Sequence, residues 1–261
     1  MAGTVRLSID GPKATITLDH PERHNAISRN MWAEMRDAAE TIASNPDIRV
    51  AVLRGAGERA FASGADISQF SEHRSDGNAN TAYDDTTGAA TAALASLPIP
   101  VIAAIHGYCL GGGLAVALTT DIRISADDGQ FAIPAARLGV GYNAPGIAGL
   151  ISLVGPSNAK EILFTASRFN APQALDMGLV NEVVAKDQLE ARVDELASSI
   201  AQNAPLTIAA VKLAVRELTK PESQRDMATV KEAVHRCFES DDYKEGVAAF
   251  TEKRPPVFRG R

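Results

Sequence analysis

The sequence predicts an α/β protein made of stacked ββα units and followed by an all-helical region. Between residue 50 and about residue 125, strand-length apolar runs alternate with helical patterns, which is the order expected of such units. After Pro156 the pattern is helical. The expected strands cover residues 50–53, 100–105 and 122–125, and the expected helices cover residues 86–96, 114–119, 158–165, 171–177, 188–202, 205–218 and 224–238.

The first residues predict a hairpin and a capped helix. Polar and apolar residues alternate over residues 5–9 and 14–18 on either side of Asp10-Gly11, which is typical of a β-hairpin. Ser28 can cap a helix that runs to about Ala43. The polar segment 72–87 predicts a mobile loop or frayed helix, with a lid over a site as one interpretation.

The likeliest internal boundary is the Asn-Ala-Pro sequence at residues 203–205. Residues 1–203 are expected to form a core that holds the functional site, and residues 204–261 a helical region. The apolar faces of that region are too small to fold alone, so we expect it to pack on another subunit.

Composition excludes several classes of protein. The chain has 261 residues, 45% of them hydrophobic, which is enough for a large core. Its net charge is −6 with no long basic run, so we expect no nucleic-acid partner. The two cysteines are far apart, which suits a reduced cytoplasm. No stretch approaches ~18 uninterrupted apolar residues, so no membrane span or membrane partner is expected.

Two glycine-bearing turns carry the functional signal. They cover residues 61–67 (FASGADI) and 106–113 (HGYCLGGG). Each follows an apolar run and precedes an expected helix, so each can aim free backbone N–H groups at an incoming oxygen. One N–H from each turn would form an oxyanion hole.

These turns and several further segments together resemble the crotonase superfamily, also called the enoyl-CoA hydratase/isomerase family. The similar segments extend from Asp19 to the C-terminus and include residues 21–26 (PERHNA), 161–166 (EILFTA), 174–181 (ALDMGLVN) and 250–254 (FTEKR). The resemblance implies a crotonase-like spiral of ββα units with a C-terminal trimerisation region. It also implies homotrimers or dimers of trimers, an acyl-CoA substrate, and no cofactor other than the coenzyme A of that substrate.

Matching the motifs residue by residue assigns the site. The resemblance implies that the N–H groups of Ala65 and Gly112 hold the thioester carbonyl. Solvated surface charge remains an alternative for Arg23 and Lys253, and Asp66 can instead cap a helix that begins at Ile67. The residues that the resemblance places along CoA are Arg23, His24, Ala26, Ala62, Ser63, Asp66, Ile67 and Leu110, with Phe250 and Lys253 at the nucleotide end, often from a neighbouring subunit.

The chain departs from the hydratase pattern where two glutamates should lie. One position is three residues after the middle glycine of the second turn and is Ala115 here. The other follows Pro134 and is Ala135. An alanine methyl group neither orients water nor transfers a proton, so ordinary two-glutamate hydration is in doubt. The isomerases of the family use the second position, or one about eight residues later, which is Asn143 here.

Residues 139–143 (GVGYN) and 161–167 resemble the methylmalonyl-CoA decarboxylase branch, which has a tyrosine at the place of Tyr142. Decarboxylation needs no general base, because loss of CO₂ leaves an enolate that the oxyanion hole can hold. The match is partial, since that branch has a histidine where this chain has Ala65. Tyr142 and Asn143 are therefore candidate catalytic side chains, and packing of Tyr142 in a loop stays open.

Three functions remain after this comparison. The first is an enoyl-CoA hydratase-like lyase, the second a decarboxylase of malonyl-type CoA thioesters, and the third a protein that binds acyl-CoA without turnover. A serine peptidase is rejected, because Leu114 follows the glycines where a nucleophilic serine would be needed. We expect Cys109 to be an inert buried thiol, and the five histidines lack metal-ligand spacing.

Overall fold

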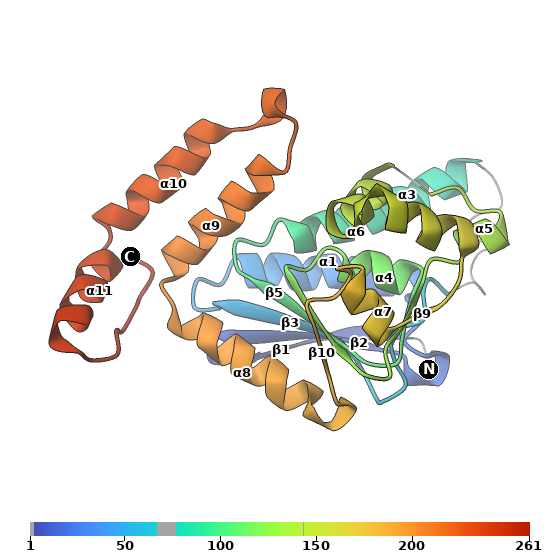
Figure 1. The fold of residues 1–261 in the computed structure, drawn as a ribbon, viewed down its shortest axis with the longest axis horizontal. Coiled ribbons are helices and arrows are strands. Elements are labelled where there is room, and N and C mark those ends of the chain that lie inside the picture. The colour runs from blue at the N-terminus through green and yellow to red at the C-terminus, as the bar shows by residue number, and fades with distance from the viewer. Residues whose placement is uncertain (1–2, 67–76, 143) are drawn as a thin grey trace.

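Two β-sheets organise the N-terminal region of the computed structural model, which describes residues 3–66, 77–142 and 144–261 (Figure 1). In the described residues the larger sheet has six strands, parallel apart from the β1–β2 hairpin, and the smaller has four. The larger sheet has the order β1 (Thr4–Asp10), β2 (Lys13–Asp19), β3 (Val50–Gly55), β5 (Val101–Ile105), β7 (Ile122–Ala126), β10 (Glu182–Val184), and the smaller has the order β4 (Ala60–Ala62), β6 (Tyr108–Leu110), β8 (Gln130–Ala132), β9 (Phe169–Asn170).

The chain repeats one ββα pattern, as the sequence predicted. The strand pairs β3–β4, β5–β6 and β7–β8 each place their first strand in the larger sheet and their second in the smaller. A helix follows each pair: α3 (Gly77–Ala95), α4 (Gly112–Ala117) and α5 (Ala135–Leu138). Because the strands of successive units pair in parallel, the turns that end β4, β6 and β8 lie at one edge of the smaller sheet.

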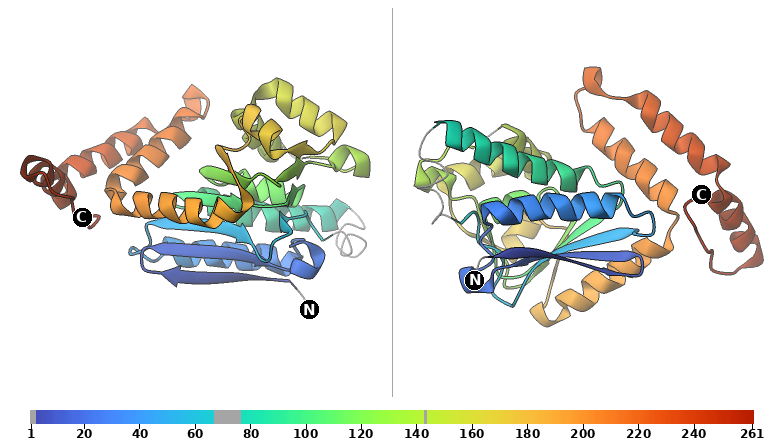
Figure 2. Two further views of the ribbon diagram at one scale, coloured as in Figure 1. Left: turned by 60° about the horizontal axis from the view of Figure 1, so that its bottom comes forward. Right: turned by 180° about the vertical axis from the view of Figure 1, so that it is seen from behind.

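The central strands of the larger sheet are buried on both faces. In β3, Val50 and Val52 face the cluster that includes Leu189 and Val193 of α8 (Leu189–Gln202). Leu53 belongs instead to the main core, which the buried side of α1 (Arg29–Ala43) joins. Figure 2 shows α1 and α8 on opposite sides of the strands. The alternation along β3 therefore sends successive side chains into two cores.

The structure confirms one local prediction from the sequence and changes the bounds of two predicted segments. The Ser28 hydroxyl accepts a hydrogen bond from the Met31 N–H at 3.4 Å and caps α1 as predicted. The segment expected to be a loop or frayed helix is helical from residue 77 onward, because α3 begins there, and residues 72–76 lie outside the described residues. The helix expected from residue 158 is the second half of α6 (Ala144–Thr165), which bends at Gly155, where φ is +74°.

The remaining elements are short helices between the strands and the longer helices of the C-terminal region. They are α7 (Ala171–Asp176) and the short 3-10 helices η1 (Pro21–Arg23), η3 (Lys186–Gln188) and η4 (Glu222–Gln224), followed by α9 (Pro205–Leu218), α10 (Met227–Glu239) and α11 (Asp241–Glu252).

The C-terminal helices α10 and α11 extend away from the sheets (Figure 1). Arg49 ties the last residues to the body, since its guanidinium donates to the carbonyl groups of Ala201 at 3.0 Å and Phe258 at 2.6 Å. Across the described residues, no helix combines the length and the apolarity needed to cross a bilayer. Large apolar side chains of this region are exposed in the single chain: Val211, Val215, Leu218, Met227, Val234, Phe238, Tyr243, Val247 and Phe250.

We predict that Gly113→Ala destabilises the protein by about 1–3 kcal/mol, as overpacking does. A Cβ atom at Gly113 would lie 2.3 Å from the Ala62 carbonyl oxygen, which is backbone and cannot move aside. Gly149→Ala in α6 is the matched control, because none of the described residues has an atom within 4 Å of its Cβ position. The control is expected to keep or raise stability through helix propensity. Thermal unfolding of both variants is the measurement, and equal melting temperatures would contradict the packing argument.

Candidate active site

A cavity of about 670 Å³ lies between the two glycine turns and helices α3, α4 and α6. Both turns contribute to its wall through Ala65 and Gly112, and Tyr142 contributes from the segment before α6. Its size is in the usual range for a small-molecule site. The cavity therefore unites three of the four residues predicted to be catalytic, and the fourth, Asn143, lies outside the described residues.

The N–H groups of Ala65 and Gly112 face the same space. A Cβ atom built on Gly112 would lie 3.3 Å from the Ala65 nitrogen. The bridge between Ile27 and Ala65 uses the Gly64 carbonyl at 2.8 Å and the Asp66 N–H at 3.0 Å. Because N–H groups alternate in direction along extended chain, the Ala65 N–H points away from that bridge.

The second donor is an N–H at the start of α4. The first hydrogen bond of this helix runs from the Ala115 N–H to the Gly111 carbonyl at 2.9 Å. Gly112 comes before this first donor, so its own N–H has no partner in the helix. In the described part of the chain, no hydrogen bond engages the N–H of Gly112 or that of Ala65. Two backbone donors thus lie close together in the wall of the cavity.

The two positions where the hydratase pattern has glutamates also face this cavity, and in this chain each carries only a methyl group. Ala115 and Ala135 line the wall, together with Pro134. Among the described lining residues there is no Asp, Glu, His, Lys or Arg. The described wall therefore offers no carboxylate to activate water and no imidazole to move a proton.

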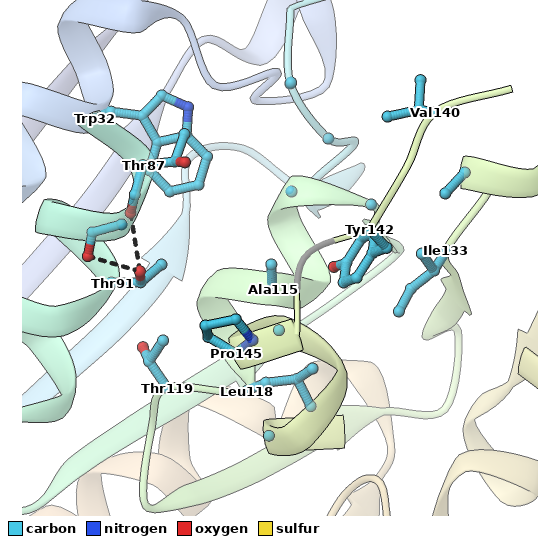
Figure 3. Close-up of a pocket in the computed structure, with 18 of the residues that line it drawn as sticks. Trp32, Thr87, Thr91, Ala115, Leu118, Thr119, Ile133, Val140, Tyr142 and Pro145 are labelled. Carbon is cyan, nitrogen blue, oxygen red and sulfur yellow. Dashed lines mark hydrogen bonds between the residues drawn. The ribbon is translucent and has the colours of Figure 1, made fainter. Parts of the chain in front are cut away.

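Tyr142 places a hydroxyl in this wall, and Figure 3 shows it directed into the cavity from the side opposite Trp32. Burial raises the pKa of Tyr142 above its usual range, because the phenolate would be poorly solvated there. The side chain is therefore a neutral hydrogen-bond donor and acceptor at neutral pH. No hydrogen bond within the described residues engages its hydroxyl.

Asn25 holds the loop of residues 23–26 beside the first turn. Its buried side chain accepts from the His20 N–H at 2.9 Å and donates to the carbonyls of Ala56 at 2.9 Å and Ala60 at 2.7 Å. Its φ of +55° is a conformation that asparagine tolerates better than most residues. Sequence analysis did not single out Asn25, although asparagine within the matched motif was a signal.

The predicted CoA-contacting residues are spread along the rim next to this loop. The Ser63 N–H donates to the His24 carbonyl at 2.9 Å, and the Ser63 hydroxyl to the Arg23 carbonyl at 3.1 Å. Arg23 also forms an ion pair with Asp66 at 3.0 Å. The structure therefore connects Arg23, His24, Ser63 and Asp66 into one hydrogen-bonded edge that ends at Ala65.

Other predicted contact residues lie beneath or away from the wall. Ala62 is buried in β4, and Ala26 is buried in the loop. Leu110 ends β6, and its carbonyl oxygen lies 3.3 Å from the Cβ position of Gly64. Ile67 lies outside the described residues.

Phe250 and Lys253 are far from the cavity within one chain. Phe250 is exposed on α11, and Lys253 follows that helix with a φ of +55°. Figure 1 shows α11 at the opposite end of the molecule from α5 and α6, which border the cavity. Neither residue is among the described residues that line the cavity of their own chain.

Cys109 is completely buried, and burial raises the pKa of its thiol, so it is not a thiolate. Within residues 3–66, 77–142 and 144–261, no cluster of His, Cys, Asp and Glu side chains could hold a metal ion.

Trp32 is a lining residue that sequence analysis missed. It lies on the buried face of α1, and its Cζ2 atom would be 3.4 Å from a Cβ atom at Gly112. The apolar spacing of Met31, Met35 and Ile42 marks that face as buried. The pattern does not reveal that the face borders the cavity, because that depends on where the glycine turn packs.

The fold and the paired turns define an acyl-CoA-processing protein with a backbone oxyanion hole as its candidate site. A sequence model described as enoyl-CoA hydratase/isomerase matches residues 11–261. The chain belongs to the enoyl-CoA hydratase/isomerase family, as the resemblance of its motifs indicated.

Related sequences and solved structures match this chain over 98–100% of its length. Proteins named carnitinyl-CoA dehydratase from Salmonella enteritidis and Salmonella typhi are 35% identical to it over 266 aligned positions, which cover 100% of both chains. An enoyl-CoA hydratase/carnithine racemase from Magnetospirillum magneticum has a TM-score of 0.95 at 38% identity, covering 100% of this chain and 97% of that one. An enoyl-CoA hydratase/isomerase family protein from Hyphomonas neptunium has a TM-score of 0.94 at 34% identity, covering 98% of each.

We predict that Asn25→Ala lowers the free energy of unfolding by at least about 3 kcal/mol. The change leaves one backbone N–H and two carbonyls without a partner, at about 1–3 kcal/mol for a buried group. Asn25→Asp is the graded control, since it keeps the acceptor but loses both donated bonds. Urea unfolding measures the three proteins, and a loss below about 1 kcal/mol for Asn25→Ala would show that the network is dispensable.

Proposed function

We propose that the chain is a lyase-type acyl-CoA enzyme in which the N–H groups of Ala65 and Gly112 hold a thioester carbonyl. The proposal is supported by the proximity of these two residues in the wall of one cavity. Removal of a proton or of CO₂ beside a thioester places negative charge on the carbonyl oxygen. Preorganised donors stabilise that charge more than the neutral carbonyl, by about 3–4 kcal/mol for one donor.

The start of α4 adds to this stabilisation. Helix N-termini carry a partial positive charge that favours a nearby anion. α4 has only six residues, so its backbone N–H groups contribute more than its dipole. The N–H of Gly112 is both hydrogen-bond donor and part of that terminus. The oxyanion role thus requires no side chain from either turn.

The CoA arm is proposed to follow the rim defined by Arg23, His24, Ser63 and Asp66. The ion pair with Asp66 at 3.0 Å fixes the Arg23 guanidinium at that rim, where it can meet a phosphate. Ala26, Ala62, Ile67 and Leu110 would contribute backbone or packing to the same path. Phe250 and Lys253 would approach the nucleotide end from a neighbouring subunit.

A homotrimer or a dimer of trimers is the assembly proposed with this site. Residues 204–261 would be its subunit-contact region and residues 1–203 the core that holds the site. The exposed apolar side chains of α9 to α11 support this division, because a large apolar surface is costly to leave in water. A cytoplasmic location is proposed on the cysteine usage alone.

The site supports the proposed substrate class more directly than it supports one particular reaction. The relatives named as dehydratases favour addition or removal of water. The described wall offers only Tyr142 for that chemistry, with Asn143 next to it in sequence. An acid for hydration would have to come from outside the described wall of the cavity.

Decarboxylation is the second candidate, and the buried Tyr142 hydroxyl facing the cavity favours it. The bond between the α-carbon and its carboxylate breaks, CO₂ leaves, and the electron pair passes into the thioester enolate. Tyr142 would orient the carboxylate, and a proton from solvent would then complete the α-carbon. No base is needed, so Ala115 and Ala135 are compatible with this reaction. Binding without turnover is the third possibility and is an outcome of the tests below.

Gly112→Ala is predicted to lower turnover of the acyl-CoA substrate about 10²–10³-fold, as much as losing one oxyanion-hole donor, because the added methyl group would keep the carbonyl oxygen away from the N–H. Its methyl group would lie 3.3 Å from the Ala65 nitrogen and occupy the place of the carbonyl oxygen. Steady-state kinetics measures the effect, and a melting curve with CoA binding checks that the protein is folded. Unchanged turnover in a folded variant would remove Gly112 from the mechanism.

Tyr142→Phe is predicted to separate the two reactions when purified protein is given crotonyl-CoA and methylmalonyl-CoA side by side. Mass spectrometry detects water addition to the first and CO₂ loss from the second. A loss of CO₂ release at unchanged CoA affinity identifies the decarboxylase, and loss of water addition identifies a hydratase that uses Tyr142. If the wild-type protein changes neither substrate nor other acyl-CoA thioesters, the enzyme proposal is wrong.

The pH profile of wild-type turnover is predicted to be flat between about pH 6 and 9. Burial raises the pKa of Tyr142, so the neutral phenol is present below that pKa and is lost only as the pH rises through it. The rate should therefore fall only in strongly alkaline solution, and Tyr142→Phe should lose that fall. A bell-shaped profile with an acidic limb near pH 4–6 would indicate an acting carboxylate.

A further inference from the structure

One part of the cavity wall contains neither Ala65 nor Gly112. Residues Thr91, Ala92 and Ala95 of α3 line it, and they lie on one helix face because of their spacing. Leu118 and Thr119 after α4 and Pro145 of α6 complete this acyl wall. Figure 3 shows Thr91, Thr119, Leu118 and Pro145 around one region of the cavity.

The hydroxyl groups of this wall are already engaged by the backbone. Thr91 donates to the carbonyls of Thr87 at 2.8 Å and Gly88 at 3.0 Å. Thr119 donates to the Val116 carbonyl at 2.7 Å. Each hydroxyl has one proton, so neither threonine can donate it to a ligand while these bonds last. Toward the cavity they act mainly as methyl groups.

The described lining also holds no ionisable group except the Tyr142 phenol, which stays neutral because burial raises its pKa. A cationic acyl group would need a carboxylate or a cage of aromatic rings. The two aromatic lining residues are on opposite sides of the cavity in Figure 3. Trp32 lies against Gly112, with 3.4 Å to its Cβ position, and so belongs to the thioester end.

We propose that the acyl wall selects acyl groups that are uncharged hydrocarbon beyond the carbons next to the thioester. The proposal rests on the acyl-CoA function proposed above and adds its substrate class. A charged group would lose its hydration in this wall without gaining a partner. A hydrocarbon chain would gain about fourfold in affinity for each buried methylene. A carboxylate on the α-carbon is compatible with this selection, because that carbon lies at the thioester end.

The relatives named carnitinyl-CoA dehydratase make this inference specific. A carnitinyl group ends in a trimethylammonium cation, which the described wall of this chain does not accommodate. The chain would therefore differ from those relatives in the acyl group that it accepts, although it is 35% identical to them.

A pair of isosteric thioesters tests the proposal on the intact protein. One is γ-trimethylammoniobutanoyl-CoA, and the other has a carbon atom in place of its quaternary nitrogen. Both are saturated, so neither can add water. Trp32 is the single tryptophan of the chain and lines the cavity, so its fluorescence can report binding. The neutral thioester is expected to bind at least tenfold more tightly than the cationic one.

A matched pair of variants tests whether the acyl wall causes this preference. Ala92 is exposed on α3, so both Ala92→Asp and Ala92→Asn should fold. The carboxylate of Ala92→Asp is expected to shift the preference toward the cation by about tenfold, as a charge partner in a partly buried site does. Ala92→Asn has the same shape without the charge and should shift the ratio by less than about twofold.

The outcomes separate this inference from the proposed function. Equal affinity of the two thioesters, or tighter binding of the cation, overturns the charge selection and leaves acyl-CoA binding intact. If neither thioester binds more tightly than free CoA, the acyl site itself is wrong and both proposals fail. If Ala92→Asp and Ala92→Asn change the ratio equally, the preference does not arise at the acyl wall.

Discussion

The candidate site depends on a backbone-to-backbone contact between the two glycine turns. A Cβ atom at Gly113 would lie 2.3 Å from the Ala62 carbonyl oxygen, so α4 can begin against β4 only because residue 113 is glycine. Gly111 has a φ of +49°, which lets the chain turn from β6 into α4 within one residue. This close contact is what brings the N–H of Gly112 to the N–H of Ala65. Without it the protein would have a sheet and a cavity, but these two N–H groups would not be neighbours.

The ββα repeat explains why residues far apart in sequence meet in this cavity. β4, β6 and β8 pair in parallel, so the segments that follow them leave the smaller sheet at the same edge. Ala65, Gly112 and Ala135 each follow one of these strands and line one cavity. The same geometry would bring acids at positions 115 and 135 to the substrate. With alanine there, the electrostatic contribution of the described wall comes from the backbone, which suits reactions that need charge stabilisation more than proton transfer.

Structural features that depend on local sequence pattern could be predicted from the sequence. The alternation over residues 50–125 and the Ser28 cap predicted the ββα order and α1. The resemblance to the crotonase superfamily implied the spiral and named Ala65 and Gly112, which line one cavity and whose shared role stays a prediction. The sequence did not predict the bend at Gly155, the start of α3 at Gly77 or the short helix α5. It also missed Asn25, whose partners Ala56 and Ala60 are more than thirty residues away. Such contacts depend on how distant turns pack, which has no periodic signature in the chain.

In a protein with a backbone oxyanion hole, the fold determines how the thioester is bound. The side chains determine proton transfer and the choice of acyl group. The Magnetospirillum magneticum structure has a TM-score of 0.95 with this chain at only 38% identity. Most side chains therefore differ between the two proteins while the path of the main chain does not. Thioester binding by N–H groups requires that path and the glycines that permit it, whereas proton transfer and acyl selection require particular side chains. Substitutions at positions 115 and 135 and in the acyl wall can accordingly change the reaction and the substrate of such a protein. The proposed binding of the thioester by backbone N–H groups would stay the same.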